Sequence, residues 1–390
     1  MTETADVIVV GAGVQGASLA FHLAERGASV LVVERRAVAA EATGRSSGFV
    51  RMHYDLEIDV QLAWASYPYF AGWHERVGHG ECGFVKTGFV QIAAPDHEDD
   101  LRANVAMQQR LGVRTEAIDP VELEAILPGI AVGDIAVAAY EPDSGHADPT
   151  GTAAGFIAGA RARGARLIQR CRVHSVAVEG DRVVGVDSDQ GRFTAPVVVD
   201  AAGAWAAELA RTAGVDVPMV PWRHDTAYFG LPEGRSPNFP VVIDDANGVY
   251  FRSEGRELML VGLETDSEIG GSPDRPIPAM TETIAERMAE RVCRRVPWME
   301  SGTLRTAHGG QDGITPDQRP VIGPAGPDGF FLSCGFSGTG FKTAPAVGAA
   351  LAELILEGRS SAVDLSPYEL RRFAEGRPLV GEHSYGVLWR

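Results

Sequence analysis

The chain has 390 residues, more than one hydrophobic core usually holds, which suggests two domains. Its composition is that of an ordinary globular protein, with 45% hydrophobic residues and no apolar stretch approaching the roughly 18 residues of a membrane span. The missing apolar stretch predicts that the chain does not cross a membrane. A formal net charge of −17 repels phosphate backbones, so we expect no nucleic-acid binding.

The first residues bear on the cellular compartment, and the cysteines and histidines bear on disulfide formation and metal binding. Met-Thr-Glu-Thr leads straight into the first apolar run without a basic or apolar leader, so we expect a cytoplasmic protein. Cys82, Cys171, Cys293 and Cys334 are scattered and form no C-x-x-C pair, which argues against a disulfide framework and a zinc cluster. None of the 10 histidines falls in a motif such as H-E-x-x-H, and we expect no metal.

The N-terminal region shows a strand, a glycine turn and a helix. Val7 to Val10 form a β-branched run, three glycines follow in the G-x-G-x-x-G pattern, and Ala17 to Arg26 have helical apolar spacing. A second apolar run from Ala28 to Val33 ends at Glu34, where the motif requires an acid for the adenosine ribose. The pattern predicts a dinucleotide site. Its expected contact residues are Gly11, Gly13, Val14, Gln15, Gly16, Glu34 and Arg35.

The polar loop from Ala42 to Gly48 offers backbone NH groups and hydroxyls that could continue a phosphate cradle, or it is only a linker. We take Gly44, Arg45, Ser46 and Ser47 from it as cofactor-binding candidates. Asp59 to Val77 is expected to form a helix that Pro68 bends or breaks. Elements expected next are a strand over Phe84 to Ala93, a helix over Asp96 to Leu111 and a helix over Pro120 to Leu127.

Asp148 and Pro149 form an N-cap and first-turn pair that should open a helix to about Arg163. The small residues of Ala201 to Trp205 suggest a return to the nucleotide-binding domain. The remaining expected elements are strands over Arg166 to Val178, Arg182 to Ser188, Val197 to Ala201, Tyr228 to Leu231, Val241 to Ile243, Val249 to Arg252 and Glu257 to Leu263, and a helix over Thr281 to Val296.

Two C-terminal motifs, Thr315-Pro-Asp317 with Arg319-Pro-Val-Ile-Gly323, and Gly335-Phe-Ser-Gly-Thr-Gly-Phe-Lys342-Thr-Ala-Pro345, resemble those of the D-amino-acid-oxidase family. The closest branch is that of the sarcosine oxidases and the β subunits of the heterotetrameric enzymes. The resemblance implies an α/β fold (α+β overall) in which a Rossmann-like FAD-binding domain is interleaved with a substrate domain on a mostly antiparallel sheet.

The resemblance also implies a division of the chain. We expect 1–80, 146–216 and 306–375 to form the FAD-binding domain, and 81–145 with 217–305 to form the substrate-binding domain. The tail 376–390, with Tyr385 and Trp389, falls outside the resemblance and docks either on a partner or on the body of the protein.

Lys342 is one of only two lysines in the chain, the other being Lys86. In sarcosine-oxidase-like proteins the matching lysine binds the substrate carboxylate, and Arg51 fits as its partner, although a surface or FAD-phosphate contact is the alternative for Arg51. Tyr250 and His224 are the first candidates for holding the amine, ahead of three weaker ones, His53, Tyr54 and Asp312. The expected FAD contacts are completed by Val173, Ala202, Gly203, Trp205, Gly310, Gly338, Gly340, Phe341 and Lys342.

Two departures from the family pattern bear on the chemistry. The position that matches the covalent FAD linkage is about Gly310, and no cysteine stands there, so we expect noncovalent FAD. The lysine that promotes the reaction with oxygen is missing near Met259 or Leu260, and Arg223 or His224 would have to supply its charge. Both O2 and another electron acceptor therefore stay open.

The expected reaction is FAD-dependent oxidation of the C–N bond of a carboxylated primary or secondary amine, with hydride transfer to flavin N5 and hydrolysis of the resulting imine. A dehydrogenase, or a flavin subunit of a hetero-complex that passes electrons elsewhere, is the alternative. An NAD-dependent dehydrogenase would need no C-terminal Gly-Phe-Lys segment. A nonenzymatic flavin redox sensor would need no pair of carboxylate-binding cations.

Overall fold

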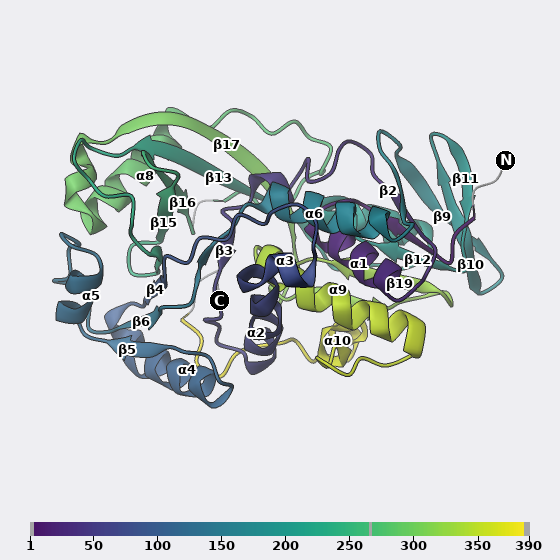
Figure 1. Ribbon diagram of the computed structural model, residues 1–390, viewed down its shortest axis with the longest axis horizontal. Helices are drawn as coiled ribbons and strands as arrows, with labels where there is room; N and C mark the ends of the chain where they lie inside the picture. The colour runs from purple at the N-terminus through teal and green to yellow at the C-terminus, as the bar shows by residue number, and fades with distance from the viewer. Residues whose placement is uncertain (1–3, 265–266, 386–390) are drawn as a thin grey trace.

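The computed structural model of the chain describes residues 4–264 and 267–385. Two main sheets occupy the two halves of an elongated molecule, and the chain passes between the halves several times (Figure 1). This mixed architecture confirms the expected fold class. Trp389, part of the expected tail, lies outside the described residues.

One half is built on a six-stranded sheet whose inner strands include the fully buried apolar runs Val7–Val10 and Val30–Val33, as is usual for parallel strands. Its strands are parallel except for one edge strand, Val321–Pro324, which pairs antiparallel with its neighbour. In spatial order they are β18 (Val321–Pro324), β19 (Phe330–Cys334), β12 (Val197–Asp200), β1 (Val7–Val10), β2 (Val30–Val33) and β8 (Arg166–Ile168).

Helices cover one face of this sheet, and a smaller sheet covers the other. Helix α1 (Val14–Glu25) packs between α6 (Pro149–Ala162) and α9 (Gly340–Glu357), with α2 (Glu57–Ala71) beyond α9 (Figure 1). The opposite face packs against α7 (Ala206–Thr212) and a three-stranded sheet of β9 (Val173–Glu179), β10 (Arg182–Ser188) and β11 (Gly191–Thr194).

The other half is built on an eight-stranded sheet that is antiparallel except for one parallel pair, β14 with β4. In spatial order its strands are β17 (Thr303–Ile314), β13 (Val220–Gly230), β16 (Leu258–Leu263), β15 (Val249–Glu254), β14 (Val241–Asp244), β4 (Phe89–Ile92), β6 (Ala138–Glu141) and β5 (Glu116–Ile118). Helix α8 (Glu282–Arg295) packs on one face. The opposite face places Tyr250 against Phe49 of the other half.

The remaining elements are short or connect the two halves. They are β3 (Phe49–Val50), β7 (Gly145–His146), α3 (Trp73–Arg76), α4 (Glu98–Arg110), α5 (Pro120–Ile126), α10 (Arg371–Ala374), and the 3-10 turns Thr43–Arg45, Pro95–His97, Gly203–Trp205, Pro297–Ser301 and Ser366–Tyr368.

Three sequence expectations need correction. The strand expected over Arg166 to Val178 is two strands in different sheets, because Arg170 adopts a left-handed conformation at φ 54° between them. The strand expected over Phe84 to Ala93 is limited to β4, which begins after Gly88 at φ 83°. Pro68 lies inside α2 without breaking it, and the helix ends at Ala71 instead.

The strands of the six-stranded sheet all fall in the segments that we assigned to the FAD-binding domain. Those of the eight-stranded sheet fall in the substrate-domain segments, apart from β17, which crosses from one assignment to the other.

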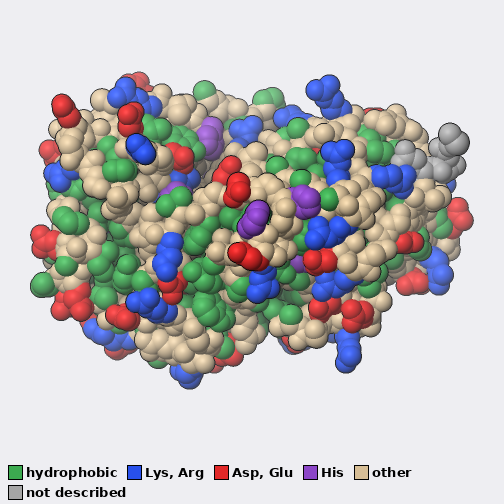
Figure 2. All heavy atoms as spheres, in the orientation of Figure 1, with side chains coloured by type: hydrophobic (Ala, Val, Ile, Leu, Met, Phe, Trp, Pro, Cys, Tyr) green, Lys and Arg blue, Asp and Glu red, His purple; other side chains and the backbone are tan. Residues whose placement is uncertain are grey.

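Basic and acidic side chains are interspersed on the face in Figure 2. In the described part of the chain, no helix is both long enough and apolar enough to span a bilayer.

Candidate active site

A cavity of about 450 Å³ lies at the carboxyl ends of the parallel strands, where open α/β sheets bind their ligands. It extends to the eight-stranded sheet, which contributes Tyr250 and His224. The structure thus brings together most of the expected cofactor residues. Those that line this large cavity are Gly11, Gly13, Val14, Gln15, Glu34, Arg35, Arg45, Ser46, Ser47, Val173, Ala202, Gly203, Trp205, Gly310, Gly338, Gly340 and Phe341.

The glycine turn after β1 is suited to a pyrophosphate. Gly11 has φ 105°, and a Cβ atom there would lie 2.5 Å from the carbonyl oxygen of Ala201, so only glycine fits. Helix α1 starts directly after this turn without a side-chain cap and without an acidic residue in its first turn. Its positive end is therefore available to an anion in the cavity.

Glu34 has a second role beside the expected ribose contact. Its Oε2 accepts a hydrogen bond from the backbone NH of Ala12 at 2.8 Å, and its Oε1 accepts one from Arg36 at 2.7 Å. The carboxylate thereby holds the glycine turn in place. Two buried polar atoms of the lining, Gln15 Oε1 and Arg45 Nε, have no hydrogen-bond partner among the described residues, as expected where a polar ligand completes the site.

Three expected cofactor contacts do not line the large cavity. Gly16 faces the turn itself, since a Cβ atom there would lie 2.1 Å from Gly11 O. Gly44 faces Ala39, whose carbonyl oxygen would lie 2.3 Å from a Cβ atom. These two glycines allow close backbone packing under the site. Lys342 lines a neighbouring cavity instead.

This second, small cavity of about 30 Å³ has room for about two water molecules. It shares five lining residues with the large cavity and is bounded further by Arg51 and Lys342. The shared wall consists of Ser46, Ser47, Tyr250, Gly338 and Phe341. A ligand in the small cavity would therefore lie directly beside one in the large cavity.

Arg51 and Lys342 are buried, with 2% and 6% of their surfaces exposed. The guanidinium of Arg51 lies 4.5 Å from the ring centroid of Tyr54, and Lys342 Nζ lies 5.5 Å from the same centroid. Among the described residues, neither cation forms an ion pair with a carboxylate. Burial, and then the charge of Arg51, hold the pKa of Lys342 well below its usual range.

Tyr250 and His224 lie in the wall of the large cavity, and the structure fixes their protonation states. Burial raises the pKa of Tyr250 to about 12, so its hydroxyl stays protonated. Gly262 on the adjacent strand makes room for this ring, because a Cβ atom there would lie 2.1 Å from the Tyr250 hydroxyl. Burial lowers the pKa of His224 to about 3, so this imidazole is neutral.

Asp312, one of the weaker candidates, holds the C-terminal glycine segment. Its Oδ2 accepts a hydrogen bond from Gly338 N at 2.7 Å, and its Oδ1 accepts one from Gly313 N at 2.8 Å. Sequence reasoning missed Thr43, which lines the large cavity and accepts a hydrogen bond from Val14 N at 3.0 Å. Its place in the polar loop beside Gly44 was the available signal.

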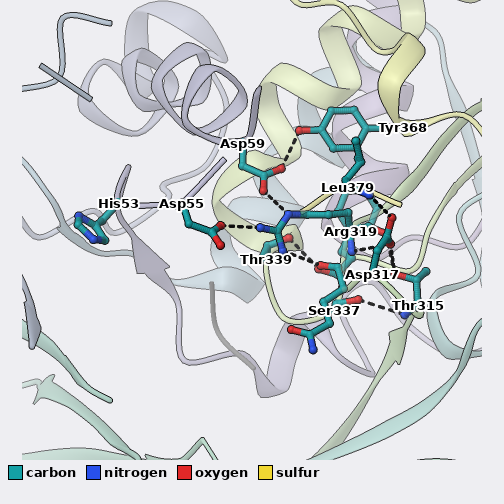
Figure 3. Close-up of polar contacts among 12 residues, drawn as sticks. His53, Asp55, Asp59, Thr315, Asp317, Arg319, Ser337, Thr339, Tyr368 and Leu379 are labelled. Carbon is teal, nitrogen blue, oxygen red and sulfur yellow. Dashed lines mark hydrogen bonds and ion pairs between the residues drawn. The ribbon is translucent and has the colours of Figure 1, made fainter. Parts of the chain in front are cut away.

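The Thr315–Arg319 motif has a structural role (Figure 3). Arg319 donates to Asp55 Oδ1 at 2.7 Å and is ion-paired with Asp59, whose Oδ1 accepts from Tyr368 at 2.7 Å. Asp317 is ion-paired with Arg372 at 2.8 Å. This network fixes the segment just after Arg51.

Comparison with known proteins gives the following similarities. Residues 6–354 match the family described as FAD dependent oxidoreductase. The mitochondrial sarcosine dehydrogenase of Homo sapiens is 29% identical over 96% of this chain and 42% of its own length. FAD-dependent oxidoreductase domain-containing protein 1 of Bos taurus is 30% identical over 96% of this chain and 86% of its own length. The chain thus spans less than half of the sarcosine dehydrogenase.

Two solved structures are similar over nearly the whole chain. L-proline dehydrogenase from P. horikoshii superposes with a TM-score of 0.89 at 26% identity, covering 97% of this chain and 100% of that one. Glycine oxidase from Geobacillus kaustophilus superposes with a TM-score of 0.83 at 26% identity, covering 95% of this chain and 99% of that one.

Proposed function

We propose that this chain, which belongs to the FAD dependent oxidoreductase family, oxidises the carbon–nitrogen bond of a small amine that carries a carboxylate. The observation that carries the proposal is the pair of buried cations, Arg51 and Lys342, on a cavity that shares a wall with the large one. Two buried cationic side chains side by side are unfavourable, and the lowered pKa of Lys342 reflects that cost, which an anion between them relieves. A substrate carboxylate supplies that anion.

The large cavity fits the FAD that the family binds. The N-terminus of α1 would receive the pyrophosphate, Glu34 would face the adenosine ribose, and Gln15 and Arg45 would offer their unpartnered polar atoms. Gly310 on the cavity wall has no side chain that could form a covalent link. The cofactor is therefore bound noncovalently.

Each residue of the proposed site has a distinct role. Arg51 and Lys342 hold the carboxylate and so orient the amine, which is the positioning part of catalysis. The flavin, when bound, accepts the hydride that leaves the substrate carbon. Tyr250 offers a hydroxyl donor to the substrate, and the neutral His224 can accept a hydrogen bond from the amine. The proton that the ammonium form must lose before oxidation passes to water, because an imidazole with a pKa of about 3 does not hold it. The resulting imine is hydrolysed by water to a carbonyl compound and an amine.

The size of the small cavity limits the substrate. A space of about 30 Å³ beside two cations accommodates the carboxylate and little more, so the carbon bearing the amine carries hydrogen or a small group. Glycine, N-methyl amino acids such as sarcosine, and proline-like cyclic amino acids satisfy this condition. The related proteins named for sarcosine, proline and glycine support this substrate class.

The electron acceptor is a separate question, and the surroundings of the site favour one other than O2. Of the two positions expected for the oxygen-activating lysine, Leu260 lies in the apolar cluster around Tyr250 and Met259 is buried in the apolar core beside α8. Arg223 is ion-paired with Asp225 at 2.7 Å, and His224 is neutral. Neither residue therefore supplies a free positive charge for a forming superoxide. A dehydrogenase, alone or as a subunit of an electron-transfer complex, fits these surroundings.

Anaerobic flavin bleaching tests the proposal. The purified yellow protein is titrated with glycine, sarcosine, proline and their carboxylate-free amine analogues, and the loss of the oxidised flavin absorbance is recorded. We expect bleaching by the carboxylated amines only. Equal bleaching by analogues without a carboxylate, or none by any amine, would overturn the proposal and leave the redox-sensor alternative. A colourless protein that reacts with NAD would indicate the nicotinamide dehydrogenase.

A further inference from the structure

We infer that the C-terminal segment 379–385, here called the strap, positions Arg51 through His53, and that Tyr385 is the positioning residue. The inference rests on the proposed function in one respect, the role of Arg51 in binding a carboxylate. It also assigns a role to the tail, whose docking place the sequence leaves open.

The strap is fixed to both halves of the molecule. Leu379 N donates to Asp317 Oδ2 at 3.0 Å, which joins the strap to the Arg319 network (Figure 3). Gly381 approaches Asp55 so closely that a Cβ atom would lie 2.5 Å from its carboxyl group. Asn104 of α4 donates to the carbonyl oxygen of His383 at 2.8 Å. The strap therefore follows a defined path toward the Met52–Asp55 segment.

At the end of this path Tyr385 meets His53. The Tyr385 hydroxyl lies 2.8 Å from His53 Nε2, and the two rings are stacked with centroids 5.9 Å apart at an interplanar angle of 13°. Only 6% of Tyr385 and 1% of His53 are exposed. A hydrogen bond made in such an enclosed place is shielded from competition by water.

The direction of this hydrogen bond follows from Gln108. Gln108 Nε2 donates to Tyr54 O at 3.1 Å, so its Oε1 is the atom that faces His53 Nδ1 at 3.1 Å. Burial lowers the pKa of His53 to about 3, and a neutral imidazole carries one N–H. That proton is on Nδ1, where it meets the Gln108 acceptor. Nε2 is then the acceptor for the Tyr385 hydroxyl.

His53 in turn sets the position of Arg51. The carbonyl oxygen of His53 accepts a hydrogen bond from Arg51 Nη1, and the next residue, Tyr54, places its ring under Arg51 and Lys342. His53 is thus clamped by Tyr385 and Gln108, while its backbone holds the guanidinium. Loss of the Tyr385 hydroxyl leaves His53 Nε2 without a donor and frees the segment to shift.

The test compares Tyr385→Phe with wild-type holoenzyme, using the flavin absorbance to follow titration with acetate as a simple carboxylate. We expect the Kd for acetate to rise about fivefold, as for loss of one hydrogen bond. With an amine substrate, KM should rise by a similar factor while the anaerobic reduction rate at saturation stays unchanged. Gln108→Met removes the other side-chain hydrogen bond to His53 and should weaken acetate binding in the same way. This second variant tests the positioning role even if Tyr385→Phe does not fold.

Two controls isolate the effect. Glu382→Ala changes an exposed side chain on the same strap, and Tyr69→Phe removes a tyrosine hydroxyl on α2 beside His22. Both should keep the wild-type Kd for acetate. An unchanged Kd in Tyr385→Phe and Gln108→Met would overturn the positioning role while leaving the proposed function intact. A wild-type protein whose flavin does not respond to acetate, glycine or sarcosine would overturn both.

Discussion

Lys342 Nζ and the Arg51 guanidinium lie over the same aromatic ring, that of Tyr54, at 5.5 and 4.5 Å from its centroid. The two cations come from opposite ends of the chain and are both buried. A cation–π contact contributes only about 0.5 to 2 kcal/mol, which is less than the cost of removing a charge from water. The ring orients the two cations, and a carboxylate bound between them would stabilise both.

Replacing Lys342 by methionine should weaken carboxylate binding while the fold is retained. A charge-assisted hydrogen bond contributes roughly 1.5 to 3 kcal/mol, which corresponds to an increase in Kd of about 10-fold to 150-fold. Acetate titration followed by the flavin spectrum measures this change. The matched control is Lys86→Met, since Lys86 is the other lysine and pairs with Asp143 at the surface at 2.6 Å. Equal affinities in the two variants would contradict the carboxylate site.

Carboxylate binding should also weaken as the pH rises. Lys342 has a lowered pKa in the free protein, and a bound carboxylate favours its charged form, so binding takes up a proton above that pKa. The Kd should then increase by up to about tenfold per pH unit. Burial raises the pKa values of the nearby Glu141 and Asp245 to about 6 and about 7, and that of Glu264 well above its usual range. Their ionisation places negative charge near Arg51 and so acts in the same direction.

Calorimetric titration in two buffers of different ionisation enthalpy reveals the proton uptake directly. Lys342→Met should show a flatter dependence of Kd on pH and take up fewer protons than the wild type. A wild-type affinity independent of pH between 6 and 9 would show that Lys342 remains charged throughout and would contradict this prediction.

Local patterns in the sequence predicted the parts of the fold that depend on neighbouring residues. The glycine turn at Gly11 and the cap at Asp148 are examples, because a turn or a cap needs specific residues at fixed spacing. The break at Arg170 was missed, because the left-handed residue there is an arginine and not a glycine. Asp312 was only a weak candidate, since its partner Gly338 becomes a neighbour through tertiary folding alone.

The candidate site shows the same division. The sequence indicated Lys342 by its rarity and Arg51 by family resemblance, and the structure places both on one cavity. The sequence did not indicate that Tyr385 contacts His53, because no sequence pattern links residues so far apart in the chain. The second role of Glu34, holding Ala12 and Arg36, was hidden for a related reason: a motif describes the ligand contact and not the supporting hydrogen bonds.

Asp274 is expected to slow the release of FAD. It joins a loop of the substrate half to three residues on the rim of the large cavity, accepting from Trp205 at 2.8 Å and pairing with Arg35 at 3.1 Å and Arg172 at 3.3 Å. Because these contacts are partly exposed, Asp274→Ala should weaken FAD binding modestly, by about threefold to tenfold. The recovery of flavin fluorescence on dilution of the holoprotein measures the release.

The matched control for this variant is Glu268→Gln on the same loop, whose partner Arg275 lies 2.6 Å away. It should release FAD at the wild-type rate. Denaturation of the wild type should also set all its flavin free, in keeping with noncovalent binding. Flavin that stays with the precipitated chain would contradict that part of the proposal.

Asp200 should make the protein less stable as the pH rises. Burial raises its pKa from 3.8 to about 7, so the protonated form is favoured in the folded state. The stabilisation is complete below pH 3.8 and is lost as the pH rises through about 7, which lowers the free energy of unfolding by about 2 to 4 kcal/mol. Asp200→Asn stays neutral and keeps the acceptor for Ala202 N, so it should be the more stable protein at pH 8.

Urea unfolding of the holoprotein at pH 5 and pH 8, with the FAD concentration fixed, measures this effect. The exposed Asp181, changed to asparagine, serves as the control and should leave the difference between the two pH values unaltered. An Asp200→Asn protein with the wild-type pH dependence would show that Asp200 does not titrate in this range.

The substrate-reduced protein should reoxidise slowly in air. A preorganised positive charge beside the site where superoxide forms would contribute about 100-fold to that reaction, as a comparable donor does in other sites. Here Leu260 is apolar, Arg223 is neutralised by Asp225 and His224 is uncharged, while Lys342 is occupied by the carboxylate.

After anaerobic bleaching with sarcosine or proline, an artificial dye should restore the yellow colour at least about 100-fold faster than dissolved oxygen at the same concentration. Prompt recovery in air with formation of hydrogen peroxide would make the protein an oxidase. It would contradict the acceptor assignment and leave the oxidation of a carboxylated amine unaffected.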